Sequence, residues 1–238
     1  MKILALDTAT ENCSVALLSD RTVVARERLL ERGHAAQILP MIDEVLAEAG
    51  IALQAVDAIA FGRGPGGFTG VRLAASVTQG LAFGVGVPVV PVSNLRALAQ
   101  RLLAADASIE HVVVCTDARM EEVYWACFER RDGLAALVGE ERLGVPEGVR
   151  LPTGWLGNDH AHASRFGAGR GFAAYPQLAA AMRPLLRGIR EDLVPRAAEI
   201  AVLAVPEIVA GRIFPAEQAL PTYLRNDVVR AGGGQSLK

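Results

Sequence analysis

A glycine-rich turn is the stretch whose residue types and spacing could most readily do chemistry. It lies between a short apolar strand and a helix that we expect over residues 69–83. Gly62, Gly64 and Gly67 have the spacing of the dinucleotide-binding fingerprint, in which a helix N-terminus holds a pyrophosphate. That fingerprint also needs an acidic residue at the end of the next strand, and residues 87–92 are followed by serine and asparagine. The dinucleotide interpretation is therefore weak.

Two other interpretations of this turn compete with the dinucleotide one. A P-loop needs Gly-Lys-Ser/Thr where the helix begins, and this chain has Gly67-Phe68-Thr69, which offers no lysine to a phosphate. The turn can also be a tight strand-to-helix connection that binds nothing, because glycine turns before helices are common packing devices. The small residues that open the helix would let another backbone or an anion approach its free N–H groups. We expect something to come near this turn.

Two acids stand directly after apolar strands. Asp7 and Thr8 lie at the mouth of a hairpin, where a carboxylate can be held over a phosphate or a metal, or can simply cap local amides. Asp117 stands in a similar turn after residues 112–115. His160-x-His162 suggests a metal, but no cluster of carboxylates or cysteines supports it, so we interpret it as a pair of loop histidines.

Composition narrows the classes of function. The chain has 238 residues, of which 51% are hydrophobic, so it can bury the core of one large domain or two modest ones. A net charge of −2 without a run of lysine or arginine argues against a nucleic-acid surface built by this chain alone. Three cysteines without CxxC spacing fit a reducing compartment. The first apolar run is interrupted too early for a secretory leader, so we expect a cytoplasmic protein without a membrane span.

The order of the expected elements predicts an α/β fold with mixed sheets flanked by helices. Strands at residues 3–6, 13–18 and 22–30 form an antiparallel meander, and helices then alternate with strands up to residue 105. Leu4-Ala5-Leu6-Asp7-Thr8 is echoed by Val113-Val114-Cys115-Thr116-Asp117, which suggests a duplicated, two-lobed fold. We expect an N-terminal lobe over residues 1–106 and a smaller C-terminal lobe over residues 107–238, with a last helix at 196–210 and a disordered tail from about residue 230.

The first helix, residues 34–49, has more apolar positions than one narrow stripe requires. Ile38, Met41, Ile42 and Val45 are among them. A wide stripe can belong entirely to the core, since helices often bury such faces, or part of it can meet a partner. Both interpretations stay open at this point.

Several motifs together resemble the bacterial TsaB (YeaZ) family of tRNA threonylcarbamoyladenosine biosynthesis proteins. The resemblance covers nearly the whole chain. The matching stretches are Ile3-Leu4-Ala5-Leu6-Asp7-Thr8-Ala9-Thr10, His34-x-x-x-Ile38-Leu39-Pro40-Met41-Ile42, Gly64-Pro65-Gly66-Gly67-Phe68-Thr69-Gly70-Val71-Arg72, Asp117-Ala118-Arg119 with Glu122-Val123-Tyr124, and Pro221-Thr222-Tyr223-Leu224-Arg225.

The resemblance implies the two-lobed fold of actin, the Hsp70 ATPase domain and sugar kinases. It also implies a noncatalytic subunit, without a cofactor, that supports transfer of a threonylcarbamoyl group to the adenosine beside the anticodon of tRNA. The implied partners are the catalytic paralogue of the TsaD (Kae, Gcp) family in a heterodimer, the ATPase TsaE at their junction, and a second copy when the chain is alone. Contact with tRNA would occur only through the complex.

The resemblance further implies which residues would form the partner interface and which would remain from a nucleotide-binding loop. The catalytic paralogue has His-x-x-x-His on its first helix, a pair that can share a metal. In this chain Ile38 stands four residues after His34, at the position of the second histidine, so we expect neither a metal site nor catalytic activity. The helices at residues 34–48 and 69–83 would pack against the paralogue, with an interface that includes His34, Ile38, Met41, Ile42, Val45, Gly70, Arg72, Leu73, Ala74 and Val77. A vestigial nucleotide loop would include Asp7, Thr8 and Asp117.

An active enzyme is the alternative hypothesis. A kinase-like ATPase would use Asp7 and Asp117 around a nucleotide, but the second lobe looks too short and irregular to build an adenine pocket. A metallopeptidase-like enzyme would need the metal pair that Ile38 interrupts, and no Ser/His/Asp or Cys/His arrangement follows from the spacing. Turnover of ATP or stoichiometric zinc in the isolated chain would support this alternative.

Overall fold

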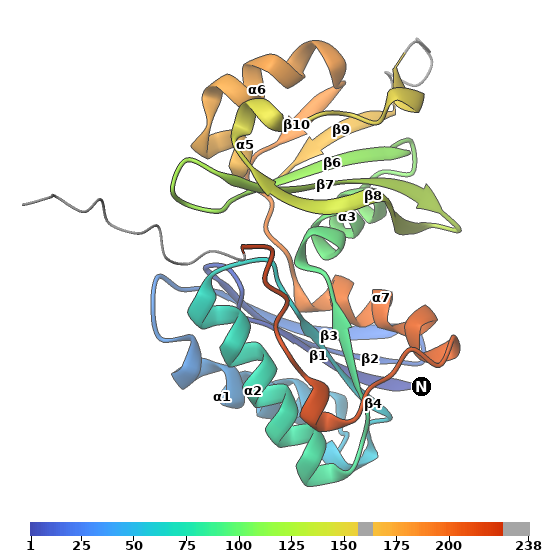
Figure 1. Ribbon diagram of the computed structural model, residues 1–238. Helices are drawn as coiled ribbons and strands as arrows, with labels where there is room; N and C mark the ends of the chain where they lie inside the picture. Colours follow the sequence, from blue (N-terminus) through green and yellow to red (C-terminus); the bar gives the residue numbers. More distant parts are fainter. Residues whose placement is uncertain (157–163, 226–238) are drawn as a thin grey trace, which may run out of the picture.

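Two mixed sheets of five strands each, stacked in two lobes, form the framework of the molecule (Figure 1). The structure is a computed structural model that describes residues 1–156 and 164–225. The His160-x-His162 pair and the tail expected from about residue 230 lie outside the described residues. The mixed α/β class expected from the sequence is confirmed.

The first sheet has the strand order β3-β2-β1-β4-β5. Its strands are β1 (Lys2–Asp7), β2 (Asn12–Ser19), β3 (Thr22–Leu29), β4 (Ala58–Gly62) and β5 (Val89–Val92). β2 runs antiparallel to both β1 and β3, whereas β4 is parallel to β1 and to β5. The predicted opening meander is confirmed, and the parallel strands bring the ends of β1 and β4 to one edge of the sheet.

Helices cover both faces of this sheet. Side chains of a strand alternate between faces, so Leu4 and Leu6 of β1 pack toward the helices α1 (His34–Ala49) and α2 (Phe68–Val85), while Ile3 and Ala5 pack toward α7 (Ala197–Val209). The short turn η1 (Leu53–Ala55) leads from α1 into β4. Both predicted helices are present, and α2 extends one residue earlier and two residues later than expected.

The second sheet repeats the connectivity of the first. Its order is β10-β9-β6-β7-β8, built from β6 (His111–Asp117), β7 (Val123–Arg131), β8 (Leu134–Gly144), β9 (Arg165–Ala168) and β10 (Gly188–Arg190). β6 corresponds to β1, because each is paired with an antiparallel strand on one side and a parallel strand on the other. This agrees with the duplication that the repeated strand-and-turn pattern suggested.

The elements around the second sheet are shorter. They are α5 (Gly171–Ala174), α6 (Pro176–Met182) and the single turns η2 (Pro146–Gly148), η3 (Thr153–Trp155) and η4 (Arg183–Leu185). The connecting helix α3 (Asn94–Ala105) covers the face of this sheet that looks toward the first lobe (Figure 1). No helix within residues 1–156 and 164–225 is long and apolar enough to cross a membrane.

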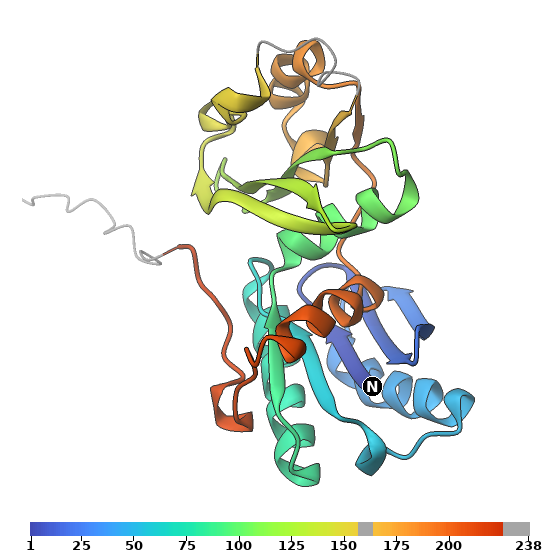
Figure 2. The ribbon, with the colours of Figure 1, turned by 90° about the vertical axis from the view of Figure 1, so that its right-hand side faces the viewer.

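After β10 the chain returns to the first lobe. α7 covers the free face of the first sheet, Phe214 pairs with Val89, and the turn η5 (Ala216–Gln218) contacts α2. Residues 219–225 then run up to the junction of the lobes (Figure 2). The expected boundary placed everything after residue 106 in the second lobe. The structure differs, because an apolar face on a helix shows that the helix is covered but not which sheet covers it.

Candidate functional site

A cavity of about 1490 Å³ lies between the two lobes. Its walls include the β1–β2 turn with Thr8, the start of α1 with His34, and the first turns of α2. Asp117 and Arg170 face it from the second lobe. Some of the residues expected at the partner interface or in the vestigial nucleotide loop line this cavity together: Thr8, His34, Gly70, Arg72, Leu73 and Asp117. Asp7 does not line it.

The β1–β2 turn of the same chain occupies the space next to the glycine-rich turn. The N–H of Gly67 donates to the carbonyl oxygen of Ala9 at 2.7 Å, and the hydroxyl of Thr8 donates to the carbonyl oxygen of Gly70 at 2.7 Å. A Cβ at Gly70 would overlap the carbonyl oxygen of Thr8. The expected close approach is therefore made by the β1–β2 turn, as the strand-to-helix interpretation allowed, and the glycines serve packing.

Asp7 and Asp117 have different surroundings. Asp7 is 0% exposed, and its Oδ1 accepts a hydrogen bond from Nδ2 of Asn94 at 2.6 Å, while its Oδ2 has no partner among the described residues. Burial raises the pKa of Asp7 from 3.8 to about 7 against the lowering effect of Asn94. Asp117 instead accepts from the Tyr175 hydroxyl at 3.1 Å and pairs with Arg119. The two acids do not converge on one site in the cavity.

The first helix carries no arrangement for a metal. Nε2 of His34 lies 2.9 Å from the carbonyl oxygen of Thr10, and since a carbonyl only accepts, this nitrogen must carry a proton. His34 therefore ties α1 to the β1–β2 turn. Ile38, one turn further, is fully buried in the core. Across residues 1–156 and 164–225 there is no group of three His, Cys, Asp or Glu side chains that could hold a metal.

Half of the residues expected at the partner interface belong to the core instead. Ile38, Met41, Ile42, Val45 and Ala74 are at most 2% exposed and pack on the first sheet, and Gly70 packs against Thr8. The physical reason is that the sheet needs a wide apolar cover, which takes most of the apolar residues of α1. Leu73 and Val77 are half-buried, and Arg72 is exposed, so these three remain available to a partner.

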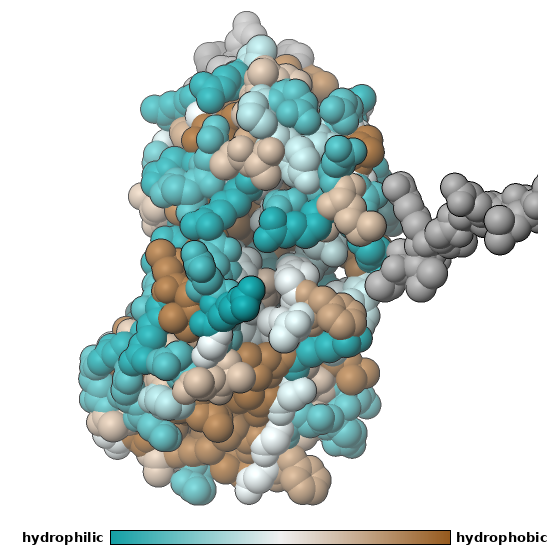
Figure 3. Space-filling model, turned by 90° about the vertical axis from the view of Figure 1, so that its left-hand side faces the viewer, coloured by the Kyte–Doolittle hydropathy of each residue, from teal (hydrophilic) through white to brown (hydrophobic). Residues whose placement is uncertain are grey.

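The outward faces of α1 and α2 show what the sequence interpretation missed. Leu39 is 50% exposed and Phe83 is 81% exposed. On α2, Ser76, Gly80 and Gly84 are also exposed, at successive turns of the helix. Figure 3 looks onto this side of the molecule, and hydrophobic residues gather there over the lower lobe. The signal in the sequence was the spacing Ser76-x-x-x-Gly80-x-x-x-Gly84 inside a helix.

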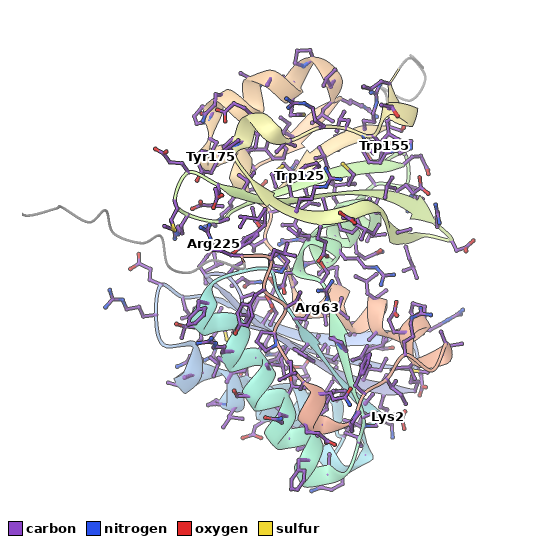
Figure 4. All side chains as sticks on the ribbon, viewed as in Figure 1. Lys2, Arg63, Trp125, Trp155, Tyr175 and Arg225 are labelled. Atoms are coloured by element: carbon purple, nitrogen blue, oxygen red, sulfur yellow. The ribbon has the colours of Figure 1, made fainter. Side chains whose placement is uncertain are left out.

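Ion pairs between described residues cross the junction of the lobes. Arg63 pairs with Glu141 at 2.9 Å, Arg225 pairs with Glu122 at 2.6 Å, and Arg170 pairs with Glu11. Arg225 also donates to the carbonyl oxygen of Ala118 at 3.2 Å. Figure 4 shows Arg63 and Arg225 at this junction. Two of the matching motifs, residues 117–124 and 221–225, therefore meet in space and hold one lobe against the other.

Arg225 also lies over an unusual turn. Arg119, Met120 and Glu121, between β6 and β7, all have positive φ angles, which non-glycine residues seldom adopt. Sδ of Met120 lies 3.3 Å from the Arg225 guanidinium, and the Tyr175 hydroxyl, which shares its one proton between Asp117 and this turn, lies 3.2 Å from the carbonyl oxygen of Glu122. The contacts from Arg225 and Tyr175 stabilise this turn at the mouth of the cavity.

Comparison with known proteins gives consistent matches. A sequence model of the family TsaD, described as tRNA N6-adenosine threonylcarbamoyltransferase, matches residues 26–234. The chain is 43% identical to the tRNA threonylcarbamoyladenosine biosynthesis protein TsaB of Haemophilus influenzae, over 96% of this chain and 95% of that protein. It is 40% identical to the TsaB protein of Escherichia coli, over 96% of each.

A solved structure agrees with these matches. YeaZ from Pseudomonas aeruginosa superimposes with a TM-score of 0.82 at 42% sequence identity, covering 94% of this chain and 99% of that one. The two-lobed architecture is therefore shared over nearly the whole length of both chains.

Proposed function

Because this chain belongs to the TsaB (YeaZ) family of tRNA threonylcarbamoyladenosine biosynthesis proteins, we propose that it is a noncatalytic subunit in the formation of that modified nucleoside. It would act by pairing, through the first lobe, with a TsaD-family transferase that carries the metal site. The main observation that supports this proposal is the outward face of α2.

No contact among the described residues explains the glycines on that face. Gly80 and Gly84 have helical backbones, and a Cβ at either position would meet no described atom within 4 Å. Glycine inside a helix costs about 1 kcal/mol relative to alanine, so each glycine lowers the stability of α2 without an internal benefit. Small residues one turn apart let a second helix approach closely. Phe83, highly exposed beside them, would be covered by the same partner.

The surroundings of His34 support a noncatalytic role. The residue one turn after it is a core isoleucine, so a metal pair cannot form there without removing Ile38 from the core. The glycine turn is occupied by the β1–β2 turn, and Asp7 lies outside the cavity. These features argue against kinase or peptidase chemistry at this cavity and so support the noncatalytic role that we propose.

The remaining parts of the proposal follow from the family and from the exposed face. Without the transferase, two copies of this chain would cover their α2 faces by forming a homodimer, because an exposed apolar face is covered by whatever fits it. We also propose that TsaE joins at the junction of the heterodimer, that tRNA is contacted only through the complex, and that the protein works in the cytoplasm.

The first experiment is light scattering on a sizing column, with this chain alone and then mixed with the His-x-x-x-His paralogue from the same genome. We expect a homodimer that gives way to a one-to-one heterodimer. The isolated chain should show no ATP turnover and no stoichiometric zinc, and the paralogue should make the modified nucleoside only with this chain present. A chain that ignores the paralogue, or that turns over ATP alone, would contradict the proposal.

A further inference from the structure

Arg72 lies at one end of the outward face of α2 and is held in a fixed position. Its guanidinium carbon lies 3.4 Å from the ring centre of Phe68, four residues earlier on the same helix. Its Nε donates to the hydroxyl of Tyr223 at 2.7 Å, and the Tyr223 ring centre lies 5.5 Å from the guanidinium carbon. The two rings are 6.0 Å apart, so the arginine is held by aromatic groups from two distant segments.

The rest of the guanidinium has no partner among the described residues. Arg72 forms no ion pair with any aspartate or glutamate in residues 1–156 and 164–225, and of its nitrogens only Nε makes a hydrogen bond there. In contrast, Arg170 and Arg225, which also line the cavity, are both paired with glutamates. Arg72 therefore presents two nitrogens in a planar fork, the geometry that binds a carboxylate or phosphate through two hydrogen bonds.

We propose that Arg72 is an anchor for a carboxylate side chain of the protein partner that packs on α2. This inference rests on the proposed function and assigns the chemistry of one contact in that interface. The stacking on Phe68 and the hydrogen bond to Tyr223 fix the side chain in advance, which removes part of the entropy cost of forming the contact. Phe68 and Tyr223 are thus positioning residues, and both remain about half exposed at 51% and 44%.

Two observations favour a protein carboxylate over a nucleic-acid phosphate. Arg72 is continuous with an apolar and small-residue face, Leu73, Ser76, Val77 and Gly80, which suits a helix surface rather than a phosphate backbone. The chain has a net charge of −2 and no run of basic residues, whereas phosphate surfaces are generally basic. Arginine and tyrosine are also the residue types that most often dominate protein interfaces.

The test is calorimetric titration of the full chain into its His-x-x-x-His paralogue at low and high salt. We expect Arg72→Gln to weaken binding at least tenfold at low salt and to remove most of the salt dependence, since salt screens the ion pair. Tyr223→Phe, which keeps the ring but removes the hydroxyl, should weaken binding about threefold. The matched control is Arg183→Gln, which changes an exposed arginine on the second lobe and should leave binding unchanged.

The outcomes separate this inference from the function on which it rests. If the unaltered chain does not bind the paralogue, the proposed function fails. If the unaltered chain binds and Arg72→Gln binds equally well, or binds more weakly with the same salt dependence, the carboxylate anchor is wrong and the proposed function stands. Loss of tRNA binding by the isolated chain in Arg72→Gln, with paralogue binding unchanged, would replace the carboxylate by a phosphate.

A rescue experiment identifies the partner group. Arg72→Glu should repel the partner carboxylate and weaken binding more than Arg72→Gln does. Each aspartate and glutamate on the paralogue helix that corresponds to α2 is then replaced singly by lysine. One of these replacements should restore binding to Arg72→Glu, and failure of all of them would overturn the inference. Thermal melting followed by circular dichroism confirms that each variant is folded.

Discussion

The two lobes share one sheet topology but differ in what covers it. In the first lobe, α1 and α2 are 16 and 18 residues long, and the outward side of α2 exposes Ser76, Gly80, Phe83 and Gly84. In the second lobe, the parallel strands β9 and β10 are joined by α5 and α6, of only four and seven residues. The sheet order is the same in both lobes, and their helices differ. The surface that we propose for a partner lies on the helices of the first lobe.

The strands β1 and β6 show the same contrast at a single position. Each ends in an aspartate at the edge where the lobes meet. Asp7 is buried in the core and accepts a hydrogen bond from Asn94. Asp117 lies at the cavity, where it forms an ion pair with Arg119 and accepts a hydrogen bond from Tyr175. A duplicated framework therefore places two carboxylates equivalently, and the neighbouring side chains decide whether each one is buried or accessible.

A charge on the inner side of α1 should have the largest effect on stability. Val45 is fully buried in the core of the first lobe, so Val45→Asp should lower the free energy of unfolding by about 4 kcal/mol or more, because a carboxylate loses its hydration there. Urea unfolding followed by circular dichroism measures the loss. The matched change on the outer side, Leu39→Asp, should alter stability by about 0.5 kcal/mol or less. Equal effects of the two changes would show that α1 has no distinct inner face.

Asp7 should make the stability of the protein depend on pH. Its pKa of about 7 in the folded state lies above its ordinary value of 3.8, so the folded state holds the proton more tightly. The free energy of unfolding should therefore fall as the pH rises from about 4 to about 7, by roughly 4 kcal/mol in total from this group, and should not fall further above pH 7. Asp7→Asn should remove this slope, as measured by urea unfolding at a series of pH values. A slope that persists in Asp7→Asn would assign it to other groups.

Much of this arrangement could be predicted from the sequence. Period-two and helical patterns gave the strands and helices of the first lobe, and the repeated Thr/Asp turn suggested the duplication. The interface residues were less predictable, because the apolar stripe of α1 is compatible with both a core and a partner. Hydrophobicity alone does not show which of two apolar faces a sheet covers. The return of α7 to the first lobe and the contact of Arg225 with Glu122 depend on distant segments, which local patterns do not report.

The glycines of α2 should give smaller changes in stability than Val45→Asp or the titration of Asp7, and they give the clearest contrast between the two sides of one helix. Gly80→Ala should stabilise the isolated chain by about 0.5–1 kcal/mol, because alanine favours a helix and its Cβ meets open space. It should also weaken binding to the paralogue, since the added methyl keeps a partner helix away. Gly70→Ala on the inner side should do the opposite to stability, lowering it by about 1–3 kcal/mol through overlap with Thr8. Thermal melting and calorimetric titration measure the two effects. If Gly80→Ala stabilises the chain and leaves paralogue binding intact, the outward face of α2 is not where the partner packs, and the difference between the lobes has another origin.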